Sequence, residues 1–264
     1  MSFFAPSISL NDTTEPFELQ VARGQIERHK AVFKFGYNDQ IGLTEETVWS
    51  QGGIYSYPAS ATVMTVSSSS ANDTAAGTGA RTVRVYGLDA DYNEIDELIT
   101  LNGQTAVNTT KSYLRAFRMI VQSAGSGGVN AGIIYMGTGT VTAGVPANKY
   151  ALVDGFGDNQ TMMLVYTVPA GFTAYMTQNN ISTAYGGNTK AHLNCRLVAR
   201  PFGQVFQSKE RLTVVDGTHS QIYTYPLVFT EKTDIEYRAK SSSGAVDFTI
   251  AGSFELLLIS NTAF

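Results

Sequence analysis

The chain has 264 residues, and only 15% of them are charged, against about 25% in an average protein. Its 18 Lys and Arg are outnumbered by 22 Asp and Glu, which argues against nucleic acid as a partner, because proteins that bind the phosphate backbone use an excess of cations. A single Cys excludes a disulfide framework and a Cys-based zinc site.

Residues 1–30 are predicted to form an extended arm, because they contain Pro6 and Pro16 and show little periodicity. The arm lacks the basic start and apolar run of a signal peptide, so export is not expected. No run of 18 apolar residues occurs, so we expect no membrane helix and no membrane partner. Aromatic residues of such an arm have nothing of their own to pack against, which makes them candidate interface anchors: Phe3, Phe4 and Phe17.

Apolar and polar residues alternate along most of the remaining chain, as at Leu193, Cys195 and Leu197. This pattern is typical of antiparallel strands with one buried and one solvent-facing side. The predicted strands lie near residues 31–35, 61–67, 80–87, 94–101, 113–122, 131–136, 161–167, 172–177, 191–200, 211–215, 221–230, 234–239 and 246–259. Strands this short and regularly spaced predict an all-β protein made of one or two antiparallel β-sandwiches or jelly rolls.

Turn residues at 154–160 (DGFGDNQ) mark the best internal boundary. They serve as a linker between a first β-sandwich over residues 31–153 and a second over residues 161–264. Each part has the length of one sandwich. A single continuous domain remains the alternative.

The low charge is concentrated in one tract. Between Met119 and Thr189 only Lys149, Asp154 and Asp158 are charged. Charge normally keeps protein surfaces apart, so a neutral tract is expected to be buried, either in a large core or against another protein chain.

Two kinds of loop are considered as ligand sites, one for calcium and one for phosphate. Residues 89–94 place oxygen-bearing side chains at alternate positions, as a calcium loop does, but Glu94 stands where such a loop needs Gly, so a turn is favoured. The glycine runs at 125–128 and 137–139 complete neither of the known phosphate-binding motifs. We interpret both runs as hairpin loops.

No catalytic or metal site is predicted. His29, His192 and His219 lack metal-ligand spacing. Cys195 alternates in phase with its apolar neighbours and is expected to be a small core residue. The acidic pairs at 45–46 and 96–97 do not have the separation that a glycosidase needs, and residues 44–49 are predicted to form a short helical turn. We therefore expect a protein that is not an enzyme and binds no cofactor.

Several stretches resemble a known family, and together they cover about residues 20–258. They are Phe33–Asn38 with Thr44–Trp49, Arg81–Gly132, and a group made of Tyr166–Gly171, Phe202–Gln207 and Glu231–Arg238. These stretches are similar to structural proteins of tailed bacteriophages, particularly marine and cyanobacterial phages. Their motifs resemble turns and strand edges, so they are specific for a fold and a source and indicate no catalysed reaction.

The resemblance implies a β-sandwich virion protein, made in the host cytoplasm and placed on the outer surface of the capsid as a decoration or cement protein. Its expected partners are the major capsid protein of the phage head and further copies of itself, in a dimer or trimer with closed symmetry.

Two other functions stay open. The first is a tail-associated protein, either a fibre attachment or a receptor- or glycan-binding module, because aromatic-rich sandwiches also bind sugars. The second is a virion-borne glycan hydrolase, because fold alone does not determine function.

Overall fold

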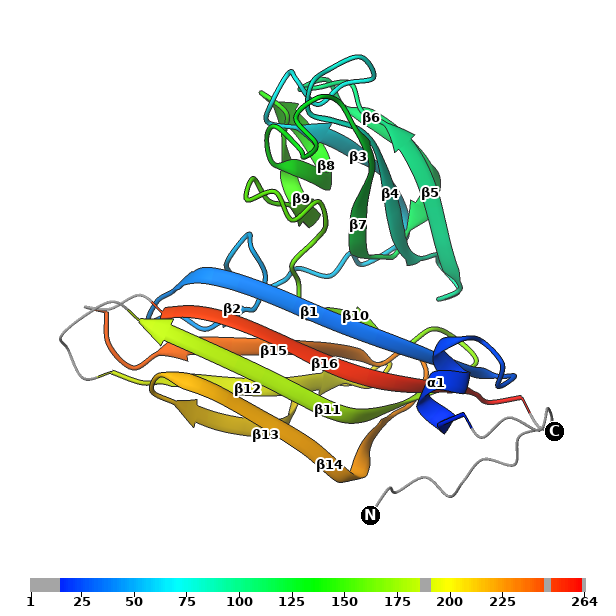
Figure 1. The fold of residues 1–264 in the computed structure, drawn as a ribbon, viewed down its shortest axis with the longest axis vertical. Helices are drawn as coiled ribbons and strands as arrows, with labels where there is room; N and C mark the ends of the chain where they lie inside the picture. Colours follow the sequence, from blue (N-terminus) through cyan, green and yellow to red (C-terminus); the bar gives the residue numbers. More distant parts are fainter. Residues whose placement is uncertain (1–14, 186–190, 245–247, 263–264) are drawn as a thin grey trace.

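The computed structural model describes residues 15–185, 191–244 and 248–262 (Figure 1). Its sheets are all antiparallel, which confirms the all-β class. No helix among the described residues is long and apolar enough to span a membrane. The elements are α1 (Phe17–Ala22), β1 (His29–Ile41), β2 (Glu46–Thr47), β3 (Thr62–Ser68), β4 (Ala80–Leu88), β5 (Glu94–Thr100), β6 (Val107–Tyr113), β7 (Arg115–Ala124), β8 (Ile134–Thr142), β9 (Val145–Val153), β10 (Val165–Thr167), β11 (Phe172–Tyr185), β12 (Leu193–Arg200), β13 (Gln207–Val214), β14 (Gly217–Phe229), β15 (Asp234–Ser241) and β16 (Phe248–Ser260).

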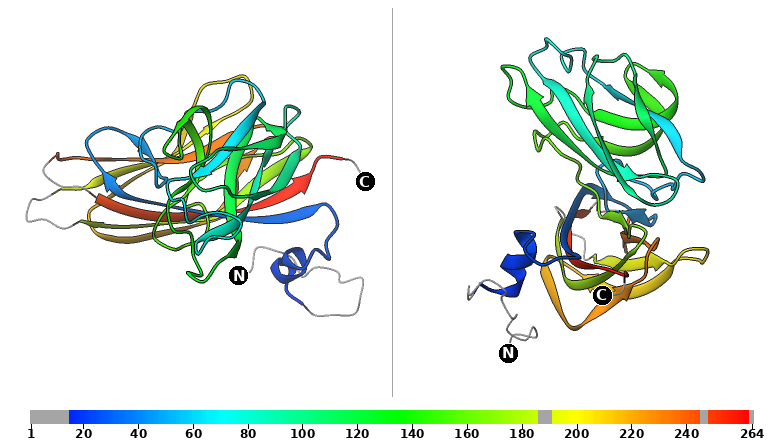
Figure 2. Two further views of the ribbon diagram at one scale, coloured as in Figure 1. Left: turned by 90° about the horizontal axis from the view of Figure 1, so that it is seen from above. Right: turned by 90° about the vertical axis from the view of Figure 1, so that its right-hand side faces the viewer.

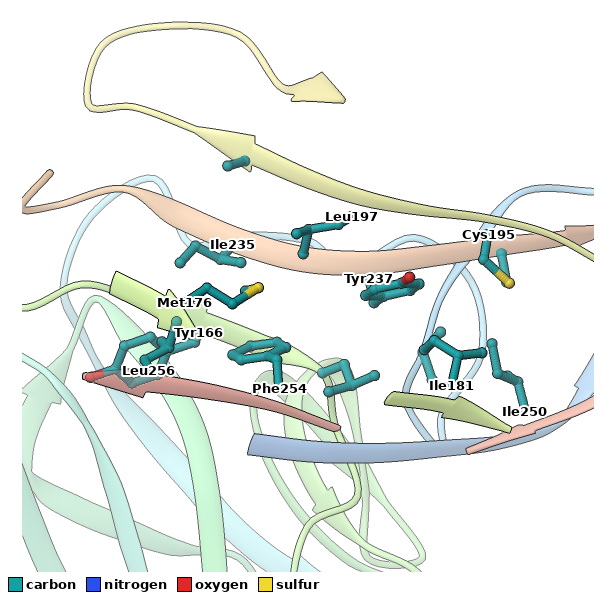
Figure 3. Close-up of a cluster of buried hydrophobic side chains, with 14 of the residues drawn as sticks. Tyr166, Met176, Ile181, Cys195, Leu197, Ile235, Tyr237, Ile250, Phe254 and Leu256 are labelled. Atoms are coloured by element: carbon teal, nitrogen blue, oxygen red, sulfur yellow. The ribbon is translucent and has the colours of Figure 1, made fainter. Parts of the chain in front are cut away.

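Strands from both ends of the chain form what we call the base sandwich. One sheet has the order β1-β16-β11-β14, and the facing sheet has the order β10-β15-β12-β13, with β2 paired to β15. Between the sheets lies a core that includes Met176, Cys195, Tyr237 and Phe254 (Figure 3). Cys195 is fully buried, as predicted, and burial raises the pKa of its thiol to about 12.

The middle of the chain forms a second unit, the inserted sandwich. Its two sheets have the orders β6-β3-β8-β9 and β5-β4-β7. They enclose a separate core, to which Met64, Val85 and Met119 contribute together with Trp49 and Met163. Because these last two residues lie where the chain enters and leaves the unit, the crossing segments complete the inserted core. The unit stands on the base sandwich beside β1 (Figures 1 and 2).

The strand pairing differs from the predicted division in one respect. Residues 31–41 were expected in the first sandwich, but β1 pairs with β16 along almost its whole length and belongs to the base sandwich. Alternation identifies a strand by its two faces but carries no information on which distant strand will pair with it. The inserted sandwich therefore begins only after the crossing segment that follows β2.

Three local expectations were wrong. Residues 17–22, inside the predicted arm, form the short helix α1. Residues 44–49 form no helical turn, because Glu46 and Thr47 make up β2 and pair with β15. The glycines at 137 and 139 lie within β8 and not in a hairpin loop; a Cβ at Gly137 would approach Asn148 O to 2.0 Å, so only Gly fits that position.

The charge-poor tract is largely buried or half-buried over its described part, 119–185, as predicted. Residues 134–137, 151–154 and 163–169 are buried core segments, and the exposed residues lie in loops such as 126–129 and 155–156 and at outward-facing positions of β7, β8, β9 and β11. Most of the missing charge is therefore explained by the two cores of this chain and needs no partner.

Close contact between the two units depends on Gly36 in β1. A Cβ at this position would lie 2.5 Å from Leu164 N and 2.8 Å from Val48 O, and both of these atoms belong to backbone that cannot rotate away. Opposite Gly36 in register stands Gly252 of β16. The crossing segments thus pass directly over a stretch of β1 that has no side chain.

Replacing Gly36 by Ala is expected to lower the free energy of unfolding by about 3 kcal/mol, because the backbone segments must separate to admit the methyl group. Urea denaturation of the purified protein measures the change. Gly155→Ala is the control, since a methyl group there would have no atom within 4 Å. Equal stability of the two variants would show that the crossing segments are not packed as described.

Candidate functional site

The outward-facing side of the sheet β1-β16-β11-β14 is the first candidate site, and we call it the outer face. Strand register places its side chains in four rows that cross all four strands. The rows are Ala31–Leu257–Tyr175–Val228, Phe33–Glu255–Gln178–Ile222, Phe35–Ser253–Asn180–Ser220 and Tyr37–Ala251–Ser182–Thr218.

The outer face is apolar at one end and almost uncharged throughout. Glu255 is its single charged residue. Phe33, Ile222 and Val228 are 51%, 70% and 58% exposed. Large apolar side chains gathered on one exposed sheet face with little charge are typical of a protein–protein interface.

The β14 edge of the sheet is irregular. Between the pairs Met176–Leu227 and Gln178–Ile222, four residues of β14 stand opposite one residue of β11, and they include Pro226 and the 82% exposed Tyr225. A bulge with Pro at an edge strand blocks the addition of a further strand. A partner is therefore expected to cover the face and not to extend the sheet.

A groove of about 410 Å³ lies on the outer face beside α1. Phe17 and Val21 of the helix line one side, and Phe33, Ile222 and Leu257 line the sheet side. Phe17, predicted as an interface anchor, is half-buried, and its ring contacts the His29 ring edge-on at 5.8 Å. The other two predicted anchors, Phe3 and Phe4, lie outside the described residues.

A buried ion pair joins the two units and forms the second candidate site, the junction. Arg115 of β7 donates from Nε to Asp234 Oδ1 at 2.8 Å and from Nη2 to Oδ2 at 3.1 Å. Asp234, at the start of β15, also accepts from Arg200 Nη2 and Thr167 Oγ1, each at 2.6 Å. Both partners of the pair are almost completely shielded from solvent, with side chains 7% and 4% exposed.

Aromatic rings contact the guanidinium groups at the junction. The Tyr57 ring contacts both Arg115 and Arg200, with centroid distances of 4.9 and 4.6 Å. The Phe206 ring contacts both Arg200 and Arg238, at 4.7 and 4.6 Å. Each contact places a cation against a ring within the distance at which the ring quadrupole attracts it, so three like charges are accommodated in one cluster.

A second buried carboxylate completes the junction. Glu236 accepts hydrogen bonds from Thr47 Oγ1 at 2.8 Å and from Arg238. Burial raises the pKa of Glu236, and the Arg238 charge opposes that shift. Glu45, expected in a helical turn, instead makes a bidentate pair with Arg196.

Lys34 of β1 is a further buried cation between the units. Its Nζ donates to Phe117 O of β7 at 2.6 Å, and burial lowers the pKa of Lys34 well below its ordinary value, with the Arg118 charge adding to the effect. No ion pair to Lys34 occurs among the described residues.

The residues considered for metal or catalytic chemistry are not brought together. Over the described ranges, no group of three or more His, Cys, Asp and Glu side chains could hold a metal ion. The loop at 89–94 is a turn, in which Asp89 Oδ1 accepts from the backbone N–H groups of Asp91 and Asn93 at 2.9 Å.

Sequence reasoning missed both candidate sites. A signal for the outer face was present, because β11 and β14 contain no Asp, Glu, Lys or Arg at all. The junction had no such signal, since Arg115 and Asp234 are separated by 119 residues.

Replacing Arg115 by Met is expected to lower the free energy of unfolding by about 3 kcal/mol, because Asp234 then keeps its buried charge without its main partner. Arg84→Met is the matched control: its ion pair with Asp96 is exposed, and loss of an exposed pair costs about 1 kcal/mol or less. Urea denaturation compares the two variants. Equal losses would contradict a structural role for the junction.

Replacing Lys34 by Met is expected to stabilise the fold by about 1 kcal/mol at pH 7, because a lowered pKa means that burial disfavours the charged form. Between its lowered folded pKa and its ordinary unfolded pKa, Lys34 binds fewer protons in the folded state, so wild-type stability rises with pH in this window. The advantage of Lys34→Met should therefore shrink between pH 7 and pH 10. Lys30→Met, on the same strand at an exposed site, controls for the substitution.

No protein-family model matches the chain, and no curated protein sequence matches it. Among solved structures, the chain is similar to the VP2 subviral particle of infectious bursal disease virus, at 11% identity over 89% of this chain and 73% of that chain, with a TM-score of 0.24. A structure of the Gx strain of that virus matches at 9% identity, over 90% and 73% of the two chains, with a TM-score of 0.28. The likeness is to an all-β viral capsid protein and is weak, so the function is argued below from the surfaces of this chain.

Proposed function

We propose that the chain is a non-enzymatic structural protein of a phage virion, and that it acts as a cement or decoration protein on the outer surface of the head. The observation that carries this proposal is the outer face, whose rows contain one charged residue, Glu255, and whose large apolar side chains Phe33, Ile222 and Val228 remain exposed. The stretches that resemble phage structural proteins support a phage virion as the assembly in which the outer face would bind a partner.

The proposed partner on the outer face is the major capsid protein. A cement protein needs a stiff scaffold and a broad contact surface, and two sandwiches locked by a buried ion pair provide the first. The large exposed apolar side chains provide the second, because removing each from water contributes about 1.5–3 kcal/mol. Self-association into a dimer or trimer is part of the proposal, and sedimentation velocity measures it.

The tail-associated role is the second candidate. The observation that favours it is the gathering of aromatic rings and cations at the junction, where Tyr92 and Phe202 stand at its solvent-facing side. Mass spectrometry of purified virions separates the two placements, because a cement protein occurs in hundreds of copies and a tail component in a handful.

Binding of purified protein to expanded phage heads tests the proposal directly. Replacing Ile222 and Val228 together by Lys is expected to weaken retention on heads by at least about 100-fold, because two large apolar contacts are lost. Leu98→Lys is the matched control, since Leu98 is 51% exposed on the inserted sandwich. All variants should keep the thermal unfolding midpoint of the wild type.

Unchanged retention of the double variant would contradict the outer face as the contact surface. Cryo-electron microscopy density confined to the tail would contradict the head placement. Deletion of residues 1–14 in the same assay measures what Phe3 and Phe4 contribute.

A further inference from the structure

A hollow of about 190 Å³ opens at the junction, on a part of the surface that the outer face does not include. It is smaller than the pockets of about 300–1,000 Å³ that enclose drug-sized ligands, so it suits a single ring. Both units contribute to it. Its lining includes Tyr92 and Arg115 from the inserted sandwich and Arg200, Phe202, Lys232 and Asp234 from the base sandwich.

The lining has more positive than negative charge. Three cations, Arg115, Arg200 and Lys232, stand against one carboxylate, Asp234. That carboxylate already accepts from two guanidinium groups and from the Thr167 hydroxyl. In a protein with a net charge of −4, this local excess favours an anionic ligand.

Two of the cations, Lys232 and Arg200, are available to pair with an anionic ligand. Lys232 has no ion pair within the described part of the chain; its Nζ lies 5.5 Å from the Tyr92 centroid and 5.4 Å from the Phe202 centroid. Arg200 directs Nε and Nη2 at Asp234 but retains 30% exposure of its side chain. Arg115, in contrast, is buried and also donates to two backbone carbonyls, so its role is structural.

Aromatic rings form the other part of the hollow. Tyr92 and Phe202 meet edge to face, with centroids 5.8 Å apart and planes at 90°. Phe202 is 63% exposed although it is a large apolar side chain. Exposed rings beside cations offer a stacking surface and a charge partner to the same ligand, and the Gln204 amide adds a donor and an acceptor.

Two of the lining residues, Tyr92 and Lys232, have a strained backbone conformation. Tyr92 and Lys232 have φ angles of 68° and 61°, in the left-handed region that bulky residues rarely occupy. The Tyr92 carbonyl accepts from Ala170 N at 3.0 Å, and Lys232 N donates to Val168 O at 2.8 Å. Glycine would fit both positions with less strain, so each side chain can be removed by a glycine substitution without a backbone penalty.

We propose that this hollow binds an acidic saccharide, in the form of one pyranose ring that carries a carboxylate. The apolar face of the sugar ring stacks on the exposed Phe202 ring, beside the perpendicular Tyr92 ring; its carboxylate pairs with Lys232 and Arg200, and Gln204 receives a hydroxyl. This inference goes beyond the capsid-binding proposal and does not depend on it, because the hollow and the outer face have no lining residue in common.

Isothermal titration calorimetry of the full chain tests the ligand class with three probes at equal ionic strength. Methyl β-D-glucuronide carries both ring and carboxylate, methyl β-D-glucoside only the ring, and acetate only the carboxylate. The glucuronide is expected to bind at least about tenfold more tightly than either other probe, because it alone uses both parts of the site. No binding of the glucuronide, or equal affinity for acetate or glucoside, would overturn the proposal.

Variants then assign the binding to the hollow. Lys232→Gly removes the ammonium group and relieves the left-handed backbone, so stability should be kept or raised while glucuronide affinity falls about tenfold. Phe202→Ala should weaken binding of the glucuronide without unfolding the chain, because the ring is exposed. Unchanged affinity in both variants would overturn the assignment.

Two controls complete the design. Lys209→Ala removes an exposed Lys of β13 elsewhere, and Ala143→Gly relieves another left-handed residue, with φ of 48°, far from the hollow in the chain. Both should bind glucuronide as the wild type does. The Ile222 and Val228 double variant should also bind it normally, so failure of capsid binding and failure of saccharide binding are distinguishable.

Discussion

Arg115 and Asp234 form an ion pair that is buried between the two sandwiches, and the placement of one unit on the other depends on it. A guanidinium group removed from water is tolerated only if its donors are satisfied, and here they reach both carboxylate oxygens and the carbonyls of Pro58 and Leu114. The rings of Tyr57 and Phe206 each contact two of the neighbouring cations. A fixed bidentate geometry of this kind selects one docking arrangement among many that would bury a similar area.

Both candidate binding surfaces follow from that arrangement. The inserted sandwich stands beside β1 (Figure 2), where Arg118 contacts Phe35 of the outer face, and Ile222 and Val228 of β14 remain exposed. The same docking brings Tyr92 of one unit against Phe202 and Lys232 of the other, which creates the hollow. The apolar face and the charged hollow are therefore separate surfaces of one molecule, and they share no lining residue.

Alternation along the chain predicted the all-β class and most of the strands, because the buried and exposed sides of a half-buried strand appear as alternating apolar and polar residues in its own sequence. It missed β2, which has only two residues, and β6, whose sequence VNTTKSY is too polar to show a period. It also missed β9, because the apolar residues of VPANKYALV do not alternate with polar ones. It also placed β1 in the wrong sandwich, since pairing with β16 joins residues more than 200 positions apart. The neutral tract was interpreted as a core or an interface, and its buried segments belong largely to the cores of this chain.

By itself, the sequence determined that this protein is made of antiparallel strands, that Cys195 is a core residue and that the loop at 89–94 is a turn, because each of these properties depends on neighbouring residues. Only the tertiary structure decided that the second unit is inserted between β2 and β10, that four strands place a nearly uncharged set of side chains on one sheet face, and that cations and rings from distant segments surround Asp234. The physical reason is that a strand pairs, and a buried charge finds its counter-charge, with residues far apart in the chain. Local periodicity cannot identify such distant partners.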